Sequence, residues 1–513
     1  MMQTYFGLSP LLAVALGGLL LMLAEAFGKP AAGQGLDAKG EVVDAGAGRG
    51  SELGLIAAVV LFAGAVFNAS VWMVGPENLP GLEQVAPYLI IDRFSVFFGF
   101  IICLASALVA LLAGAYLPEH RIDRGEFFPL LVFSTVGAMA LAAAGDLLTL
   151  FVALETMSLG VYSMIGLRRG SARAIEAALK YFLLGSFAAA LMLFAGALLY
   201  GVTGHTDLAG IGIALSSLQG EAVGGQTGIL IVAIALMLVG LLFKVSAVPF
   251  HMWAPDAYEG APTPTTSYMA AIVKSAAFAM LLRVLFSAFG DERIASWGAG
   301  WPPILLLLSV LSMFVGNLIA GRQASVKRML AYSSVAHAGY ALVGVVAASR
   351  GAEAQASVLF YLFAYGVSTV GAFGALMLIG SYGKEAVSYE DLAGLGRRHP
   401  APALAMSLFL ISLAGMPPTG GFFGKLYVFQ GAVDHELYLL AVLGLMNSVI
   451  GAYYYLKVLV YMYMREPKVD APVAVPMKSG MAVAALVIAA VFVLLLGCFP
   501  DRFLTIAQAA VLH

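Results

Sequence analysis

The chain has 513 residues, of which 61% are hydrophobic and only 11% are charged, so its apolar residues cannot all be buried in one soluble core. The formal net charge of -2 gives no electrostatic case for binding nucleic acid. The two cysteines, Cys103 and Cys498, lie in apolar runs and offer no disulfide framework and no ligand set for zinc or an iron–sulfur cluster.

Apolar runs follow one another along the whole chain, and each is long enough to cross roughly 30 Å of hydrocarbon. The runs do not alternate polar with apolar residues, so they predict helices and exclude a membrane barrel. The first run lacks a basic segment before it and is expected to be a retained span, not a signal peptide. The expected fold is an all-α polytopic membrane protein with about fourteen transmembrane helices. The predicted spans are residues 4–27, 53–74, 91–117, 126–144, 146–168, 171–203, 227–253, 262–286, 301–320, 325–348, 353–381, 402–430, 433–463 and 478–499.

The loops predict an orientation for these spans. Residues 28–52 are rich in glycine and alanine with mixed charge, which is typical of a flexible loop. Most of the lysines and arginines outside the spans, such as Arg169 and Arg397, follow odd-numbered spans. Because basic loops stay on the cytoplasmic side, both termini are expected on the side away from the cytoplasm. The lack of a transit peptide favours a bacterial inner membrane, in which that side is the periplasm.

Four charged residues lie deep inside predicted spans. They are Glu155, Lys244, Lys274 and Lys425. A charge at the centre of a membrane helix costs about 2.5–3.5 kcal/mol on insertion scales, so such residues pair with one another, reach the membrane surface, or serve a function. Structural ion pairs are one interpretation, and a functional relay is the other.

Two of the buried lysines accompany prolines that interrupt their helices. Pro249 follows Lys244 by five residues, and Pro417 and Pro418 precede Lys425. A proline inside a helix frees a carbonyl group, and free carbonyls at membrane depth are tolerated only where protein or water satisfies them. Interrupted helices in both halves of a chain indicate a transport site. A buried lysine whose proton affinity depends on a movable carboxylate suits protons, and no substrate-sized polar cluster is present.

Other titratable groups fit either a structural or a relay interpretation. Lys180 has Glu176 four residues earlier on the same helix face, and Lys457 lies within another predicted span. His251 follows the first break, and His337 lies in AYSSVAHAGY. Hydroxyl groups that could extend a proton path are those of Ser333, Ser334, Tyr361, Tyr365, Ser368 and Thr369.

Several of these stretches resemble one protein family. The resemblance is to subunit N of the bacterial-type NADH–quinone oxidoreductase, respiratory complex I. It covers roughly residues 90–460 in order. The stretches that carry it are LFVALETMSLGVY (150–162), ALKYFLLGSFAAA (178–190), FKVSAVPFHMWAPDAYEGAPTP (243–264), IVKSAAFAMLLR (272–283), KRMLAYSSVAHAGY (327–340) and GMPPTGGFFGKLYVF (415–429).

The resemblance implies the antiporter-like fold, with two inverted five-helix repeats that each contain a broken helix. It implies that Glu155 pairs with Lys244, that Lys274 links toward the centre, and that Lys425 lies at the outward half-channel. The implied domains are 1–125 with three helices, 126–300 and 301–465 with one repeat each, and 466–513 with a last helix. The residue at 425, the absence of a histidine soon after Pro264, and the end of the chain after its last span favour subunit N over the related subunits L and M.

The resemblance also implies a function. The chain would move protons from cytoplasm to periplasm as a non-redox subunit, without cofactor or metal of its own. NAD, FMN, iron–sulfur clusters and quinone are expected in partner subunits, with antiporter-like subunit M and the small subunits J and K as neighbours. The alternatives are a subunit of a Mrp-type cation/proton antiporter and a structural bundle with inert charge pairs.

Overall fold

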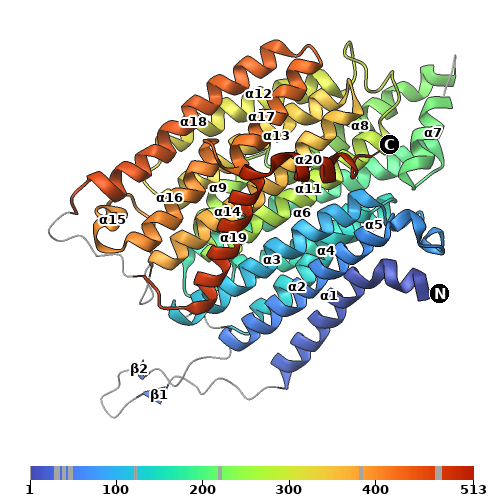
Figure 1. Ribbon diagram of the computed structural model, residues 1–513. Coiled ribbons are helices and arrows are strands. Elements are labelled where there is room, and N and C mark those ends of the chain that lie inside the picture. The colour runs from blue at the N-terminus through green and yellow to red at the C-terminus, as the bar shows by residue number, and fades with distance from the viewer. Residues whose placement is uncertain are drawn as a thin grey trace.

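A computed structural model shows an all-helical bundle (Figure 1). It describes residues 2–27, 35–36, 42–43, 50–120, 122, 124–217, 222–380, 385–467 and 476–512. The all-α membrane fold predicted from the sequence is confirmed, because twelve helices in the described part of the chain are long and apolar enough to cross a membrane. The predicted total of about fourteen spans also includes α4 (Phe127–Ala143) and the interrupted pair α16 (Pro400–Ala414) and α17 (Gly420–Asp434), which fall short by length.

With the exception of α8, the helices before the first break keep close to their predicted bounds, since each apolar run ends at a polar or turn-forming segment. These elements are α1 (Met2–Ala26), α2 (Gly50–Val74), α3 (Arg93–Glu119), α5 (Leu147–Ile165), α6 (Ala172–Thr203) and α8 (Ala222–Val245). Asp146 caps α5, because its side chain accepts from the backbone of Leu148 at 2.8 Å.

The helices after the first break complete the bundle. They are α9 (Trp253–Gly260), α10 (Thr263–Tyr268), the π-helical turn η3 (Met269–Val273), α11 (Lys274–Arg283), the π-helical turn η4 (Val284–Ala288), α12 (Trp301–Ala320), α13 (Val326–Ala348), α14 (Gln355–Ile379), α15 (Leu395–Arg398), α18 (Tyr438–Met464), and α19 (Gly480–Cys498). Four short 3-10 turns lie between helices: η1 (Pro76–Asn78), η2 (Leu82–Gln84), η5 (Ala352–Ala354) and η6 (Glu390–Leu392).

Several elements lie outside the predicted spans. Among them are α7 (Leu208–Ser217), the C-terminal amphipathic helix α20 (Pro500–Gln508), and an antiparallel pair of two-residue strands, β1 (Gly35–Leu36) and β2 (Val42–Val43). The strand pair lies in the stretch predicted to be a flexible loop, and most of that stretch lies outside the described residues. Helix α20 packs on α14 and α19.

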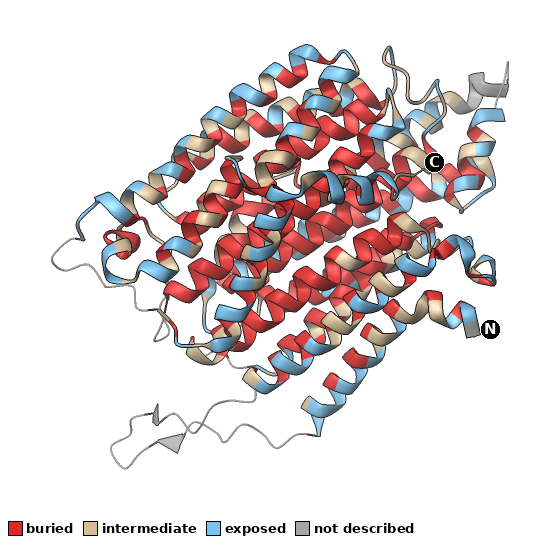
Figure 2. Cartoon of the chain, in the orientation of Figure 1, coloured by how far each residue is buried: buried red, intermediate tan, exposed pale blue. Residues whose placement is uncertain are grey.

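The core of the bundle is formed by four central spans. These are α3, α13, α14 and the span from Thr263 to Ala288, each at least 94% buried over its most apolar window. The surrounding spans, such as α1, α6, α12 and α18, keep one apolar face exposed, as a surface in lipid requires (Figure 2). A charge placed on a central span is therefore far from any lipid headgroup, and it needs partners inside the protein.

A buried charge cluster fastens the central helices to each other on one side of the bundle. Glu385, in the segment after α14, accepts hydrogen bonds from Tyr116 of α3 and from Thr263 of α10, the latter at 2.7 Å. Lys327 of α13 lies 3.4 Å from the same carboxylate and donates to the carbonyl of Ala261 at 2.7 Å. Glu385 thus links α3 to α10 and α13, which belong to the two halves of the chain.

Candidate functional site

The first break is the non-helical segment between α8 and α9, where the sequence predicted an interruption at Pro249. Helix α8 already ends at Val245, four residues before this proline. Ser246 adopts a left-handed conformation with φ 62, and the amides of Ser246 and Ala247 donate to the carbonyls of Phe243 and Leu242 at 3.1 and 3.0 Å. These two bonds form a Schellman motif, which ends a helix and satisfies its free carbonyls. The predicted single span of 227–253 is therefore wrong at its end, because the helical part stops at Val245.

Lys244 lies in the last turn of α8 and is almost fully buried, with 1% of its surface exposed. Its Nζ donates a hydrogen bond of 2.9 Å to the hydroxyl of Ser158 on α5. The ammonium also lies 5.8 Å and 5.6 Å from the ring centroids of Tyr162 and Tyr181. Its direct partners are thus a hydroxyl and aromatic faces, which stabilise a cation less strongly than a carboxylate does.

Glu155 lies on the same helix as Ser158, one turn earlier, and within electrostatic range of Lys244. These two described residues form no direct ion pair in the structure, so the pairing that the family resemblance implied stays a prediction. Lys244 instead contacts Ser158, which sequence reasoning did not single out. The signal that could have found it is the i, i+3 spacing from Glu155, which puts both side chains on one face of α5.

Buried polar atoms around Lys244 retain unused hydrogen-bonding capacity. Glu155 Oε1, the hydroxyl of Tyr181 and the hydroxyl of Ser246 form no hydrogen bond within the described part of the chain. Buried polar atoms that lack a protein partner are normally satisfied by internal water. The first break therefore provides a site that can accept water next to a lysine and a carboxylate.

The second break repeats the backbone of the first. Helix α16 ends at Ala414, and Gly415 takes φ 84. The amides of Gly415 and Met416 donate to the carbonyls of Ser412 and Ile411 at 2.9 and 3.2 Å, which is again a Schellman motif. In both breaks the residue three positions after the left-handed one is a cis proline, Pro249 or Pro418.

Lys425 begins the second turn of α17, after the break, and it reaches back to the end of α16. Its Nζ donates to the carbonyl of Ala414 at 2.9 Å and to the hydroxyl of Ser448 on α18 at 3.0 Å. The C-terminal end of a helix carries partial negative charge and favours a cation. Lys244 therefore lies in the last turn of α8, and the ammonium of Lys425 contacts the last residue of α16, although one lysine precedes its proline and the other follows it.

Lys274 and His337 lie between the two breaks in the central helices. Lys274 directly follows the π-helical turn η3, a local irregularity that is frequent at functional sites. Its Nζ donates to the carbonyl and to the hydroxyl of Ser334, and the hydroxyl also accepts from Tyr365 at 3.0 Å. His337 shares hydrogen bonds with the hydroxyls of Tyr361 at 2.6 Å and of another tyrosine on α18 at 3.0 Å.

That second tyrosine, Tyr455, also hydrogen-bonds to the hydroxyl of Ser333. The sequence singled out Ser333 as part of a possible proton path, but Tyr455 and Ser448 were missed. Both lie on α18. Tyr455 is more than a hundred residues from its partner His337, and Ser448 is about twenty residues from its partner Lys425. No local pattern marks such contacts, because they depend on how α18 packs against α13 and α17.

The remaining candidates lie outside this buried line. Lys180 is exposed and forms ion pairs with Glu176 at 2.6 Å and with Asp256 at 2.9 Å. His251 lies half-buried in the linker between α8 and α9, and no contact among the described residues connects it to the lysines. Lys457 is half-buried, with its ammonium 4.5 Å from the ring centroid of Tyr389.

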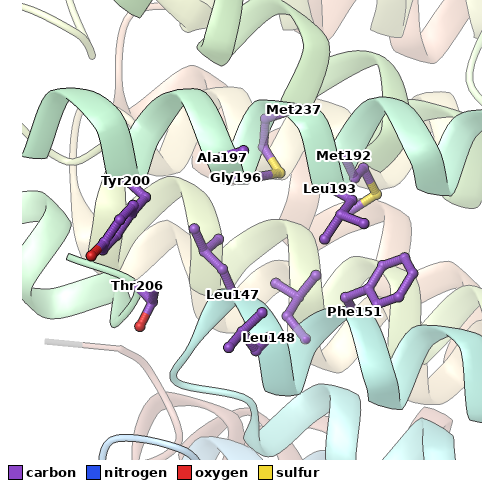
Figure 3. Close-up of a pocket in the computed structure, with 11 residues that line it drawn as sticks. Leu147, Leu148, Phe151, Met192, Leu193, Gly196, Ala197, Tyr200, Thr206 and Met237 are labelled. Carbon is purple, nitrogen blue, oxygen red and sulfur yellow. The ribbon is translucent and has the colours of Figure 1, made fainter. Parts of the chain in front are cut away.

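The structure offers a groove but no metal centre among the described residues, where no cluster of three His, Cys, Asp or Glu side chains occurs. Figure 3 shows the groove, of about 260 Å³, between the start of α5, α6 and α8. Exposed apolar side chains such as Leu148 and Leu193 line it, and none of the candidate charges does. It is therefore part of the membrane-facing surface, and the candidate site is a line of buried side chains instead of a pocket.

Comparison with known proteins gives consistent results. Residues 144–451 match the family model described as NADH:quinone oxidoreductase/Mrp antiporter, TM. The chain is 63% identical to NADH-quinone oxidoreductase subunit N 1 of Sorangium cellulosum, over 99% of this chain and 98% of that protein. It is 45% identical to NADH-quinone oxidoreductase subunit N of Trichlorobacter lovleyi, over 82% of this chain and 84% of that protein.

Two solved structures are similar over nearly the whole chain. A chain of respiratory complex I from Thermus thermophilus superposes with a TM-score of 0.76 at 34% identity and covers 97% of this chain and 99% of its own length. A chain of the Mrp complex from Dietzia superposes with a TM-score of 0.81 at 22% identity, over 99% of this chain and 97% of its own. The second likeness, at this low identity, concerns the fold alone.

Proposed function

The chain belongs to the NADH-quinone oxidoreductase subunit N family, and from this premise we propose that it translocates protons across a membrane as a subunit of that enzyme complex. The observation that carries the proposal is the line of titratable groups through the bundle, in which the three lysines and the histidine are buried and the glutamate is half-buried. Glu155 and Lys244 lie at the first break, Lys274 and His337 in the central helices, and Lys425 at the second break.

The contacts of these groups suit proton transfer. A carboxylate partner only accepts hydrogen bonds, and it holds a lysine in the charged form. The direct partners here are the serine hydroxyls of Ser158, Ser334 and Ser448, which can accept from an ammonium or donate to a neutral amine. Each lysine can therefore keep its hydrogen bond in both protonation states, so a change of charge requires no change of partner.

Movement of one carboxylate would then set the direction of transfer. Glu155 is near Lys244 without a direct ion pair, so a small approach would favour the charged lysine and a small retreat would release its proton. Transfer of one charge against 100 mV costs about 2.3 kcal/mol. The chain needs a remote energy source for this, which we assign to quinone reduction in partner subunits.

The finer features follow as parts of the same proposal. The chain is a non-redox subunit without a cofactor, and NAD, FMN, iron–sulfur clusters and quinone belong to its partners. Its neighbours are subunits M, J and K, and it lies in a bacterial inner membrane with both termini on the periplasmic side. Two inverted repeats, at 126–300 and 301–465, follow the first three helices at 1–125, and the last helix lies at 466–513.

A Mrp-type antiporter subunit is the alternative, because a Mrp chain shares the fold. The identity of 63% to a subunit N and of 34% to a complex I chain weighs against it. Purification of the chain from its native membrane separates the two possibilities. Co-purification with NADH-oxidising subunits supports the oxidoreductase, and isolation with other antiporter subunits alone contradicts it.

The direct test of the relay is the substitution Lys244→Ala. NADH-driven proton uptake is measured in inverted membrane vesicles with other pumps inhibited, and it is normalised to assembled complex. Proton uptake should fall, because the substitution removes the ammonium that donates to Ser158 at the first break. Lys457→Ala is the matched control, since it removes a half-buried lysine outside the line. A normal ratio of protons to electrons in Lys244→Ala contradicts the proposal.

A further inference from the structure

Lys425 differs from a lysine in an ordinary buried ion pair, because no carboxylate occurs among its described contacts. Its ammonium donates to two neutral oxygens, the carbonyl of Ala414 and the hydroxyl of Ser448. It also lies 4.9 Å from the ring centroid of Tyr340 on α13, a shorter cation–ring distance than at Lys244 or Lys274. The face of an aromatic ring attracts a cation electrostatically, and the attraction strengthens where water is excluded.

A buried polar network holds the ring of Tyr340 in place. Its hydroxyl accepts a hydrogen bond of 3.0 Å from Asn317 Nδ2, and Asn317 Oδ1 accepts one of 2.9 Å from Tyr454. Asn317 Nδ2 also donates to the carbonyl of Asn447 at 3.1 Å. At most 1% of each of these four side chains is exposed. The network joins α12, α13 and α18, so the ring cannot turn away from Lys425 without breaking buried hydrogen bonds.

The same ring contacts the next titratable group in the line. The rings of Tyr340 and His337 meet edge to face, with centroids 5.6 Å apart and an angle of 80°. His337 lies within electrostatic range of Lys425, but no hydrogen bond joins these two described residues. Tyr340 is thus a side chain that contacts both the central histidine and the lysine of the second break.

We propose that Tyr340 is a positioning residue for Lys425, whose ring face, fixed by Asn317, takes the place that a carboxylate occupies in an ion pair. The ring stabilises the ammonium at the end of α16 but accepts no proton itself, so the proton on Lys425 stays available for release. This inference rests on the proposed function, because it concerns how Lys425 takes part in proton translocation.

The test changes the electrostatics of the aromatic ring in steps, and every variant in the series equally lacks the hydroxyl that Asn317 contacts, so the series is read against Tyr340→Phe. Position 340 is replaced in the full complex by phenylalanine and by phenylalanine carrying one, two or three ring fluorines, which weaken the negative ring face in steps. Proton uptake per NADH oxidised is measured in inverted vesicles and normalised to assembled complex. We expect a stepwise decrease, on the order of threefold between the unfluorinated and the trifluorinated ring.

A trifluorinated ring at Phe373 is the matched control, because Phe373 is also buried in a central helix, α14, and no described cation lies over its ring. Its proton uptake should equal that of the unmodified chain. Tyr340→Leu removes the ring altogether. Its proton uptake should be at least as low as that of the trifluorinated variant, which tests the role of the ring without fluorine.

Two results separate the inference from the proposed function. Equal proton uptake across the fluorine series, together with loss of uptake in Lys425→Ala, overturns the role of Tyr340 and leaves that of Lys425 intact. Normal uptake in Lys425→Ala overturns both. A stepwise decrease together with an impaired Lys425→Ala variant supports both.

Discussion

Replacement of Glu385 by glutamine tests how the cluster that joins α3, α10 and α13 is stabilised. Burial by itself raises the pKa of this carboxyl, but the charge of Lys327, hydrogen bonds from Tyr116 and Thr263, and the charge of Arg168 outweigh burial and lower the pKa from 4.5 to about 2. The carboxylate is therefore stabilised by its surroundings, although it is largely buried.

The magnitude follows from the size of this shift. One pKa unit corresponds to about 1.4 kcal/mol, so the folded chain favours the charged form of Glu385 by on the order of 3 kcal/mol. Because the pKa in the folded chain is lower than in the unfolded chain, this contribution is complete above pH 4.5. It decreases as the pH falls from 4.5 toward 2 and is absent below that.

Glu385→Gln should accordingly lower the free energy of unfolding at neutral pH by about 3 kcal/mol, since it also leaves the ammonium of Lys327 buried without a counter-charge. The assay is unfolding of the purified subunit in mixed detergent micelles, followed by tryptophan fluorescence. A double-mutant cycle with Lys327→Met measures the coupling of the two charges. A difference below about 0.5 kcal/mol at pH 7, or one that does not shrink below pH 4.5, refutes the reasoning.

The remaining predictions concern backbone strain and an ion pair between a buried arginine and a partly exposed aspartate. Ser246→Gly should stabilise the chain by about 0.5–1 kcal/mol, because it relieves a left-handed serine, whereas Gly415→Ala should destabilise it by about 1–2 kcal/mol. The new methyl of Gly415→Ala would also lie 2.8 Å from Lys425 Cδ, so proton uptake should fall with it. Arg283→Met should cost about 2–3 kcal/mol and reduce the amount of assembled complex, since it breaks two hydrogen bonds of 2.9 Å to Asp92, which is partly exposed. The same unfolding assay and quantification of the complex in membranes check these values, and equal effects of the Ser246 and Gly415 variants would contradict the strain argument.

The sequence predicts the spans well because membrane helices are marked by local composition. The spans predicted at 146–168 and 325–348 correspond to α5 and α13 within three residues at every end. Burial of Lys274 and Lys425 was also predictable, since each lies within an apolar run that must cross the bilayer.

What the sequence does not reveal depends on contacts between distant segments. Ser246 ends α8 in a left-handed conformation that glycine, but not serine, would have suggested. Glu385 looks like an ordinary loop charge and yet inserts between three helices. Ser158 and Tyr455 become partners of Lys244 and His337 only through helix packing. Helix α20 was missed because its nine residues are too few for a span.

The matching ends of α8 and α16 have a consequence for engineering this scaffold. Each Schellman motif is formed by backbone hydrogen bonds, which do not depend on the side chain that bears the charge. At the first break Lys244 belongs to the helix before the break, and at the second break Lys425 belongs to the helix after it. The backbone turn and the position of the lysine are thus independent of each other. A lysine can therefore be moved from one side of either break to the other without changing the turn.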